Sequence, residues 1–368
     1  MRLAILGTRG IPANYGGFET FAEELGARLA DRGHEVTVYC RDHYVPRGSR
    51  QHRGVHLVVL PTVRHKYLDT LVHTFLSMCH ALTKGYASVV VCNAANALFC
   101  APLRAVGVRV LLNVDGIERK RRKWNALGRG WYRLSERLAT WCPTEVVTDA
   151  EVIREYYDVR YGCPSTFIPY GCRVGRDAGR ATLDRFGLEP DRYLLYVSRL
   201  EPENNAHVVV RAYEDSGVTV PLVVVGDAPY AREYIESLKR LAGPRVLFTG
   251  AVYGDGYREL QCHALAYVQA TEVGGTHPAL IEAMGFGNCI LVNDVPEHRE
   301  VVGTAGLYFS AAEPASLAVR FREVTADAST VTDLRLRATA RARERYSWDA
   351  VTDSYEALLG GCTRRRAA

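Results

Sequence analysis

The segment EVGGTHPALIEAM, residues 272–284, joins two different sequence patterns. The apolar run before it, residues 264–268, has the length of a short buried strand, and the apolar residues after it recur at helical spacing. The turn Gly274-Gly275-Thr276 therefore lies where a strand ends and a helix begins. In an open α/β sheet, backbone N–H groups and a helix dipole bind anionic ligands at this position. We expect Glu282, about two turns into the helix, to face the same crevice.

Short apolar runs alternate with helical patterns along the rest of the chain. We predict strands at residues 3–6, 36–40, 55–60, 88–92, 108–114 and 145–148, and again at 193–198, 221–226, 245–250, 264–268 and 288–293. A polar, glycine-rich stretch at residues 173–179 separates the two series. This order predicts an α/β protein with two Rossmann-like, doubly wound parallel sheets that face a cleft.

The same pattern sets the expected domain boundaries. We place an N-terminal domain at residues 1–172 and a C-terminal domain at residues 173–346. The last helical stretch is interrupted near Tyr346, and Ser347 has the character of an N-cap that restarts a helix. We therefore expect residues 347–362 to return to the first domain.

Composition is typical of a globular protein and gives no indication of a nucleic-acid-binding protein. The chain has 368 residues, of which 48% are hydrophobic and 24% charged, and these values are typical of a soluble globular protein. A net charge of +5 is too small to indicate a nucleic-acid partner. Two basic clusters, residues 119–123 and 364–366, are interpreted most simply as solvated surface.

The ten cysteines form no CxxC pair, and several lie in apolar runs. This usage is typical of buried thiols in a reducing compartment rather than of a disulfide framework or a zinc site. The first residues lead directly into a strand without the layout of a signal peptide, and no apolar run is long enough to span a bilayer. We expect a cytoplasmic protein, with peripheral contact at the inner membrane face left open.

A dinucleotide-dependent dehydrogenase is one alternative for the N-terminal half. Asp42 follows the second predicted strand, where an acid that binds ribose would stand. However, the glycines run Gly7-x-x-Gly10 and then Gly16-Gly17, which is not the G-x-G-x-x-G fingerprint. The loop is also longer than a dinucleotide turn needs, so we expect its tip to have another role.

Four motifs in chain order resemble those of one enzyme family. They are GTRGIPANYGGFET at residues 7–20, VDGIE at 114–118 with the basic residues after it, SRLEPENN at 198–205, and VGGTHPALIEAM at 273–284. Together they resemble the GT-B-fold glycosyltransferases of the large retaining family four, and more narrowly its rhamnosyltransferase-type branch. The resemblance covers nearly the whole chain.

The resemblance implies a retaining glycosyltransferase that moves a deoxysugar, such as L-rhamnose, from a dTDP- or UDP-sugar to a hydroxyl group. The acceptor would be a glycan or a lipid-linked glycan, as in polysaccharide biosynthesis. The nucleotide sugar is then a co-substrate, and no further cofactor is expected. Because no D-x-D sequence occurs in the chain, we predict no metal ion.

The resemblance also implies roles for individual residues. In the second domain, Arg199, the N–H groups of Gly275 and Thr276, and a helix dipole would stabilise the departing diphosphate, and Glu282 would bind the ribose hydroxyls. The remaining residues assigned to donor binding are Asn204, Gly226, Asp227, Tyr253, Gly274 and His277.

On the acceptor side we single out two carboxylates of the first domain. Asp115 and Glu19 are candidates for holding the acceptor hydroxyl or the sugar, and for Glu19 a favourable charge in the first turn of its helix is the structural alternative. We place Gly16, Gly17 and Lys120 in an acceptor or diphosphate loop. Because the departing phosphate can itself take the acceptor proton, no protein base is required.

The chain departs from the wider family pattern at three positions. Asn204 stands where a lysine is usual, Gly274 stands at the first glutamate of the E-x7-E motif, and Asp115 stands at a common histidine. Glu272, two residues before Gly274, is a candidate to replace the lost carboxylate, and we include it among the catalytic candidates. Gln269 and Thr271 also differ from the branch, which tends to have histidines there.

Two further functions stay open at this point. A small natural-product acceptor, for example an aminocyclitol antibiotic precursor with a dihydrostreptose-like donor, fits the same chemistry, and the chain shows no clear amphipathic membrane helix that would favour a lipid-linked acceptor. Alternatively, Asn204 and Gly274 would suit a catalytically silent protein that only binds a nucleotide sugar.

Overall fold

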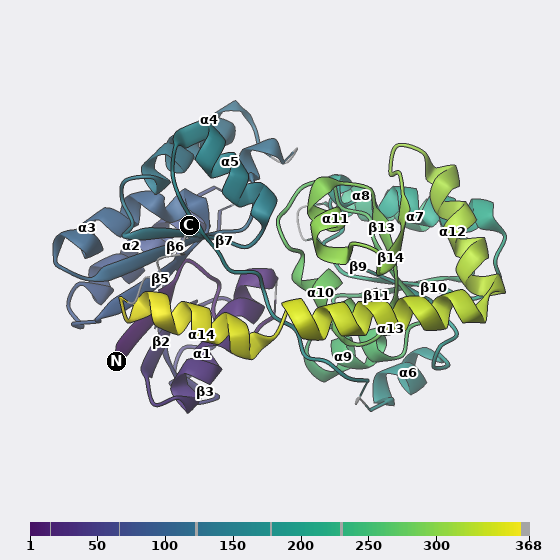
Figure 1. The fold of residues 1–368 in the computed structure, drawn as a ribbon, viewed down its shortest axis with the longest axis horizontal. Coiled ribbons are helices and arrows are strands. Elements are labelled where there is room, and N and C mark those ends of the chain that lie inside the picture. The colour runs from purple at the N-terminus through teal and green to yellow at the C-terminus, as the bar shows by residue number, and fades with distance from the viewer. Residues whose placement is uncertain (15, 66, 122–123, 177–178, 229–230, 362–368) are drawn as a thin grey trace. The chain divides into compact units, whose positions relative to one another are not determined.

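Each half of the chain folds around its own β-sheet in the computed structural model (Figure 1). The structure describes the chain except residues 15, 66, 122–123, 177–178, 229–230 and 362–368. Tyr15 of the N-terminal motif, Arg122 and Lys123 of the first basic cluster, and all of the second basic cluster thus lie outside the described residues. One unit extends from Met1 to Gly171 and includes the last helix, and the other extends from Cys172 to Ser347.

The first unit contains an eight-stranded sheet in the order β3-β4-β2-β1-β5-β6-β7-β8. All neighbouring strands are parallel except β3 and β4. Its elements are β1 (Arg2–Leu6), α1 (Gly17–Asp31), β2 (Glu35–Arg41), β3 (Gln51–His52), β4 (Val55–Leu60), α2 (Asp69–Ala81), β5 (Ser88–Cys92), η1 (Ala94–Phe99), α3 (Cys100–Ala105), β6 (Arg109–Val114), η2 (Glu118–Lys120), α4 (Ala126–Ala139), β7 (Glu145–Thr148), α5 (Glu151–Tyr161), β8 (Thr166–Phe167) and α14 (Trp348–Leu359).

Helix α14 is part of the first unit, which confirms the expected return of the terminal helix. Its Tyr355 ring lies 5.1 Å from the ring of Phe21 in α1, measured between centroids. At the edge of this packing, Arg32 Nη1 lies 2.6 Å from a carboxylate oxygen of Glu356. The buried aromatic pair fastens the helix to α1, and the more exposed ion pair contributes less.

The second unit contains a six-stranded, fully parallel sheet in the order β11-β10-β9-β12-β13-β14. Its elements are α6 (Ala181–Phe186), β9 (Leu194–Val197), η3 (Pro202–Asn204), α7 (Ala206–Ser216), β10 (Leu222–Val225), α8 (Arg232–Leu241), β11 (Val246–Gly250), α9 (Gly254–Cys262), β12 (Ala266–Gln269), α10 (Pro278–Gly285), β13 (Cys289–Asn293), α11 (Pro296–Val302), β14 (Gly306–Phe309), α12 (Pro314–Ala326) and α13 (Ala328–Arg345).

The strand order of the second unit determines where a ligand site is expected. The first three strands are added outward from β9 on one side, and β12, β13 and β14 are added on the other. The direction in which successive strands are added to the sheet therefore reverses between β9 and β12, which are hydrogen-bonded parallel neighbours. Ligands of doubly wound folds bind beyond the carboxyl ends of the two strands at such a switch point.

Most predicted strands agree with the structure to within two residues, and residues 55–60, 88–92 and 145–148 agree at both ends. The short strands β3, β8 and β14 were not predicted. The helix before the interruption near Tyr346 begins at Ala328, because the Asp327 side chain accepts hydrogen bonds from the N–H groups of Ser329 and Thr330 and caps α13. Within the described part of the chain, no helix has the length and hydrophobicity to cross a membrane.

Candidate functional site

Two loops meet at the switch point of the second unit. The loop after β9 carries Arg199, and the loop after β12 carries the turn Gly274-Gly275-Thr276. Leu194 pairs with Ala266 and Tyr196 pairs with Val268, so the carboxyl ends of the two strands lie at the same edge of the sheet. The structure thus brings together two segments that are far apart in the sequence, and a hydrogen bond joins residues 67 positions apart.

Asn205 joins the two loops. Its side-chain Nδ2 donates hydrogen bonds to the carbonyl of Ala270, at 2.9 Å, and to Oε1 of Glu272, at 3.1 Å. Its backbone has a left-handed φ of 60°, which asparagine tolerates better than most residues. The sequence motif contains Asn205, but we assigned it no role, because no local pattern indicates a partner so far along the chain.

Asn204 shapes the loop that carries Arg199. The buried amide of Asn204 donates a 2.7 Å hydrogen bond to the Arg199 carbonyl, and the Asn204 carbonyl accepts a 2.6 Å bond from the Tyr196 hydroxyl. The Arg199 side chain is half-buried. At the position where a lysine is usual, the structure therefore has an amide that holds the backbone around the arginine.

The loop after β10 approaches the Arg199 loop closely. Gly226 has a φ of 145°, and a Cβ atom added to it would lie 1.8 Å from the carbonyl oxygen of Ser198. Only glycine fits this contact without strain. Asp227 is exposed, and its Oδ1 accepts a hydrogen bond from the N–H of Ala228; Tyr253, before α9, is also exposed.

A buried glycine turn leads directly into α10. Gly274, Gly275 and Thr276 are buried, and Pro278 is the first residue of α10. Proline suits this position because its fixed φ starts a helix and its missing N–H would have no helical partner. The positive end of the α10 dipole therefore lies at Thr276 and His277.

Glu282 is half-buried in the second turn of α10. Its Oε2 accepts a 2.7 Å hydrogen bond from the hydroxyl of Tyr257 in α9, and Gln261 donates to that hydroxyl at 3.0 Å. Burial, with the charge of Glu282 as a second cause, raises the pKa of Tyr257 well above its usual value. Glu282 is thus a positioned carboxylate rather than part of a solvated helix face. Tyr257 and Gln261 were not predicted as site residues.

The two acidic candidates of the first unit lie around the end of β5. Glu19 and Asp115 both act on Cys92, whose pKa is raised by burial and then by their negative charges. Glu19 is buried, and its Oε1 accepts a 2.9 Å hydrogen bond from the N–H of Arg9, so it also holds the long loop after β1. Asp115 is half-buried at the end of β6.

The other candidates of this unit lie on the surface or in the loop. Gly16 is the N-cap of α1, Gly17 is its first residue, and Lys120 is exposed at the end of η2. Asp42, the acid considered for a dehydrogenase, is engaged by Arg47 at 2.6 Å, and this hydrogen bond lowers the pKa of its carboxyl group. Its environment is that of a structural ion pair.

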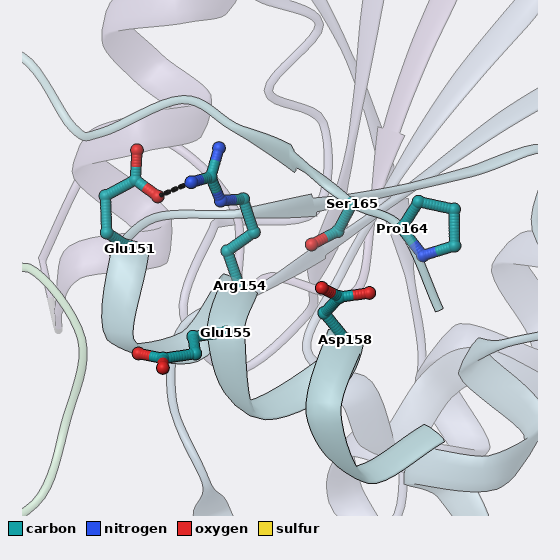
Figure 2. Close-up of a pocket in the computed structure, with 6 residues that line it drawn as sticks. All are labelled: Glu151, Arg154, Glu155, Asp158, Pro164 and Ser165. Atoms are coloured by element: carbon teal, nitrogen blue, oxygen red, sulfur yellow. Dashed lines mark ion pairs between the residues drawn. The ribbon is translucent and has the colours of Figure 1, made fainter. Parts of the chain in front are cut away.

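A depression of about 460 Å³ lies beside α5 (Figure 2). It is lined by Glu151, Arg154, Glu155, Asp158, Pro164 and Ser165. Glu151 and Arg154 form a 2.6 Å ion pair at its rim. None of the residues predicted from the sequence lines it. Among the residues that the structure describes, no group of three or more His, Cys, Asp and Glu side chains is arranged to hold a metal ion.

Models of two domain families match the chain. The first, described as a glycosyl transferase 4-like domain, matches residues 16–171. The second, described as glycosyl transferases group 1, matches residues 191–327. The two matches together cover most of the chain, one in each unit.

Solved structures of the same fold match almost the whole chain. Sucrose-phosphate synthase from Thermosynechococcus elongatus has 18% sequence identity and a TM-score of 0.81, with 98% of each chain covered. HepE from Anabaena in complex with UDP-glucose has 16% identity and a TM-score of 0.79, covering 98% of this chain and 100% of HepE. An α,α-trehalose-phosphate synthase (UDP-forming) from Burkholderia vietnamiensis has 11% identity and a TM-score of 0.72, covering 98% and 100%. No curated protein sequence matches the chain.

Proposed function

We propose that this chain, which is a glycosyltransferase of the GT-B type, moves a sugar from a nucleoside-diphosphate donor to a hydroxyl group with retention of configuration. The observation that carries this proposal is the meeting of the Arg199 loop and the 274–282 segment at the switch point of the second sheet. One cationic side chain and a helix N-terminus suit the diphosphate, and a positioned carboxylate suits the ribose hydroxyls.

The chemistry follows from these groups. The bond between the sugar C1 and the diphosphate oxygen breaks, and the acceptor oxygen bonds to C1 on the same face. The acceptor proton passes to the departing phosphate oxygen, so the products are the glycoside and a protonated nucleoside diphosphate. Arg199, the N–H groups of Gly275 and Thr276, and the α10 dipole would stabilise the charge that develops on the leaving group. These groups would stabilise the negative charge on the leaving diphosphate without a metal ion.

A pyrimidine nucleotide is the proposed leaving group. HepE was solved with UDP-glucose, and the trehalose-phosphate synthase is named for forming UDP. We propose UDP or dTDP for this chain, with Glu282 at the ribose hydroxyls and Tyr257 holding its carboxylate. The choice of a deoxysugar such as L-rhamnose rests on the N-terminal motif at residues 7–20.

The surface of α4 supports an acceptor presented at a membrane. Leu127 and Leu134 are 83% and 48% exposed, and Trp141, just after the helix, is 74% exposed. They are spaced by seven residues and thus follow one face of the helix. The exposed side also carries arginines at positions 129, 133 and 137.

Glu136, the acidic residue of α4, does not neutralise the positive charge of these arginines. Glu136 is buried, and its Oε2 accepts hydrogen bonds from Arg119 and Tyr156. An exposed face with large apolar side chains, arginines and no carboxylate is typical of helices that lie in the interface of an anionic membrane. The sequence analysis found no clear amphipathic membrane helix, and we propose the exposed face of α4 as the surface for membrane contact. We therefore favour a lipid-linked acceptor over a small soluble one.

Transfer and binding assays test the catalytic proposal. The protein is assayed with a panel of UDP- and dTDP-sugars, with and without EDTA, and nucleotide binding is measured by calorimetry. Arg199→Ala should weaken UDP or dTDP binding by roughly 10- to 100-fold, as expected for a lost charged hydrogen bond, whereas Arg240→Ala, at an exposed position in α8, should not. Loss of activity with EDTA would exclude the metal-free mechanism. Binding without turnover across the acceptor panel would favour the silent alternative.

Vesicle sedimentation tests the acceptor proposal. The wild type should bind vesicles that contain phosphatidylglycerol more strongly than vesicles of phosphatidylcholine alone, and added salt should weaken the binding. Leu134→Asp should reduce binding, and Leu336→Asp, at a 68% exposed leucine of the second unit, is the control. Equal sedimentation of the two variants would remove α4 from the proposal and favour the small soluble acceptor.

A further inference from the structure

Helix α2 has an exposed apolar stripe that the proposed donor site does not use. Phe75 and Cys79 are the exposed residues within this helix, which is described throughout, and Leu68 and Leu82 are exposed at its two ends. Leu68, Phe75 and Leu82 are 45%, 49% and 37% exposed, and their spacing of seven residues places them along one side of the helix. The side of α2 that faces water therefore carries no charged residue.

The titratable residues of α2 hold the helix in this orientation. A carboxylate oxygen of Asp69 lies 2.6 Å from Nη1 of the buried Arg41. Nδ1 of His80 lies 2.9 Å from the hydroxyl oxygen of Tyr39. His73 is buried, and burial lowers its pKa to about 4. Because these contacts fix the rotation of α2 about its axis, the apolar stripe cannot turn inward.

The stripe belongs to the same helical layer as α4. Helices α2, α3 and α4 lead from β4 to β5, from β5 to β6 and from β6 to β7, so all three cross the parallel sheet in one direction. Right-handed crossovers place such helices on the same face of a sheet. The short helix η1 contacts both α2 and α4, and its Phe99 ring lies 6.2 Å from the ring of Phe75, measured between centroids. The outward sides of α2 and α4 therefore form parts of one surface.

Exposed apolar side chains gather on this layer. Besides those of α2 and α4, Leu98 of η1 and Val106, just after α3, are exposed. Helices α1 and α14, which are both described throughout and pack together on the other face, expose no large apolar side chain. The next helix of the layer, α5, exposes Glu155 and Asp158, so the apolar surface ends at α4. Exposed apolar residues that gather on one face indicate an interaction surface.

We propose that the stripe of α2 inserts into the acyl-chain boundary of an anionic membrane beside the face of α4, so that two helices of the first unit contact the bilayer. This inference rests on the proposed acceptor at a membrane. The arginines of α4 attract anionic headgroups, and the uncharged stripe of α2 suits the hydrocarbon that begins beneath those headgroups.

A second copy of this chain fits the surface less well than a membrane does. Burial against a protein would remove the arginines at positions 129, 133 and 137 from water. Helices α2, η1, α3 and α4 are described throughout and contain two carboxylates. Asp69 is paired with Arg41. Glu136 is buried and paired with Arg119. Neither carboxylate could neutralise the arginines of a partner copy, and an unpaired buried charge is costly, whereas at a membrane the arginines stay hydrated and meet lipid phosphates.

Contact through two helices has a consequence for the acceptor. A unit that touches a membrane through one helix can roll about the axis of that helix. A second contacting helix removes this rotation. The distance from the headgroups to the acceptor candidates Glu19 and Asp115, which belong to the same unit, is then fixed.

A fluorescent label at Cys79 tests the insertion of α2. Cys79 lies on the stripe and is exposed, whereas the other free cysteines of the described chain are buried. Cys362, which lies outside the described residues, is replaced by serine, and an environment-sensitive fluorophore is attached to Cys79. The reference protein carries Cys79→Ser and Leu336→Cys, which moves the label to an exposed position of the second unit. Both proteins are mixed with phosphatidylglycerol vesicles, with and without brominated acyl chains.

The label at Cys79 should shift its emission to the blue on vesicle binding and should be quenched by the brominated chains, whereas the label at position 336 should show neither effect. Phe75→Asp should lower the partition constant for these vesicles roughly tenfold, because a charge in place of an apolar ring opposes insertion. Val319→Asp, at an equally exposed apolar residue of the second unit, should leave it unchanged. The label readout does not depend on the folding of either variant.

The outcomes separate this inference from the acceptor proposal. A Cys79 label that stays in water, while Leu134→Asp still reduces vesicle binding, would overturn the insertion of α2 and leave the membrane surface of α4 intact. A blue shift without vesicles, together with a dimer in sedimentation velocity, would assign the stripe to a second copy and overturn the inference. If the wild type bound no vesicles, the membrane-presented acceptor would fail and the insertion of α2 with it.

Discussion

Replacing Gly274 with alanine should disturb the site without unfolding the second unit. The added Cβ would lie 2.3 Å from Cε1 and 2.7 Å from Nε2 of His277, well inside the roughly 3.5–4.0 Å of a normal carbon contact. The backbone of Gly274 is outside the left-handed region, so alanine can adopt it. The clash is with a side chain that can rotate. We therefore expect the imidazole of His277 to move and the backbone to stay.

The magnitude follows from what the ring leaves behind. Rotation breaks the 3.2 Å contact between His277 and Thr271, and a neutral hydrogen bond contributes about 0.5–1.5 kcal/mol. This loss should lower the melting temperature of the second unit by about 1–6 °C, at roughly 2–4 °C per kcal/mol for a unit of this size. Because His277 lies against the glycine turn of the proposed donor site, its movement should also raise the KM for the donor by up to about tenfold, since 1.4 kcal/mol corresponds to tenfold.

Gly226→Ala is the contrasting variant. Its Cβ would lie 1.8 Å from the carbonyl oxygen of Ser198, and its φ is 145°. Here the neighbour is backbone and cannot rotate away, so about 1–3 kcal/mol of backbone strain adds to about 1–3 kcal/mol of overpacking. Thermal unfolding and donor KM are measured for both variants. Equal losses of stability, or an unchanged KM in Gly274→Ala, would refute the reasoning about a movable ring.

Three further outcomes are expected. Tyr257→Phe should weaken UDP or dTDP binding by roughly 2- to 100-fold in calorimetry, because Glu282 loses the hydroxyl that orients it, and an unchanged affinity would place Glu282 outside the ribose site. Asn205→Ala should lower the melting temperature more than Asn205→Gly. Both variants lose the hydrogen bonds to Ala270 and Glu272, but glycine adopts the left-handed backbone without strain. Equal shifts in melting temperature would show that alanine is not strained at this position. The free energy of unfolding should fall with acidification, because burial lowers the pKa of His73 and His298 to about 4. Between about pH 6.5 and 4 the unfolded chain binds protons that the folded chain does not. The loss is up to about 1.4 kcal/mol per pH unit for each histidine. Unfolding followed at pH 7.5, 6, 5 and 4.5 checks this, and a flat profile would contradict it.

The fold was predictable because its strands are covered on both faces. Such strands appear in sequence as unbroken runs of apolar residues, as in β5 (Ser88–Cys92) and β13 (Cys289–Asn293), which are buried throughout. The glycine turn after β12 could also be located from the sequence, because the short segment between a strand and the following helix must contain the turn. The edge strands β3, β8 and β14 have two to four residues and are partly exposed, so they carry no comparable signal.

The partners of the site residues could not be predicted, because they are distant in sequence. Asn205 bonds to Glu272 across 67 positions, Tyr257 to Glu282 across 25, and Thr271 contacts His298 across 27. Apolar periodicity contains no information about such pairs. The exposure of the leucines of α4 could not be predicted for a different reason: a helix with apolar residues on its exposed side resembles, in sequence, a helix that buries them.

Three of the four departures from the family pattern in the second unit, Gly274, Thr271 and Gln269, are linked through His277. Gly274 lacks the side chain that would collide with the imidazole of His277, that imidazole is bonded to Thr271, and the Thr271 hydroxyl is bonded to Gln269. A carboxylate at position 274 and the present ring position of His277 exclude each other sterically. The glycine, the threonine and the glutamine are therefore one linked set rather than three independent losses. Contacting residues of this kind couple, so the effects of Gly274→Ala and Thr271→Val on the donor KM should be less than additive in a double-mutant cycle, because each removes the same His277 contact. Additive effects on the donor KM would show that the substitutions act independently.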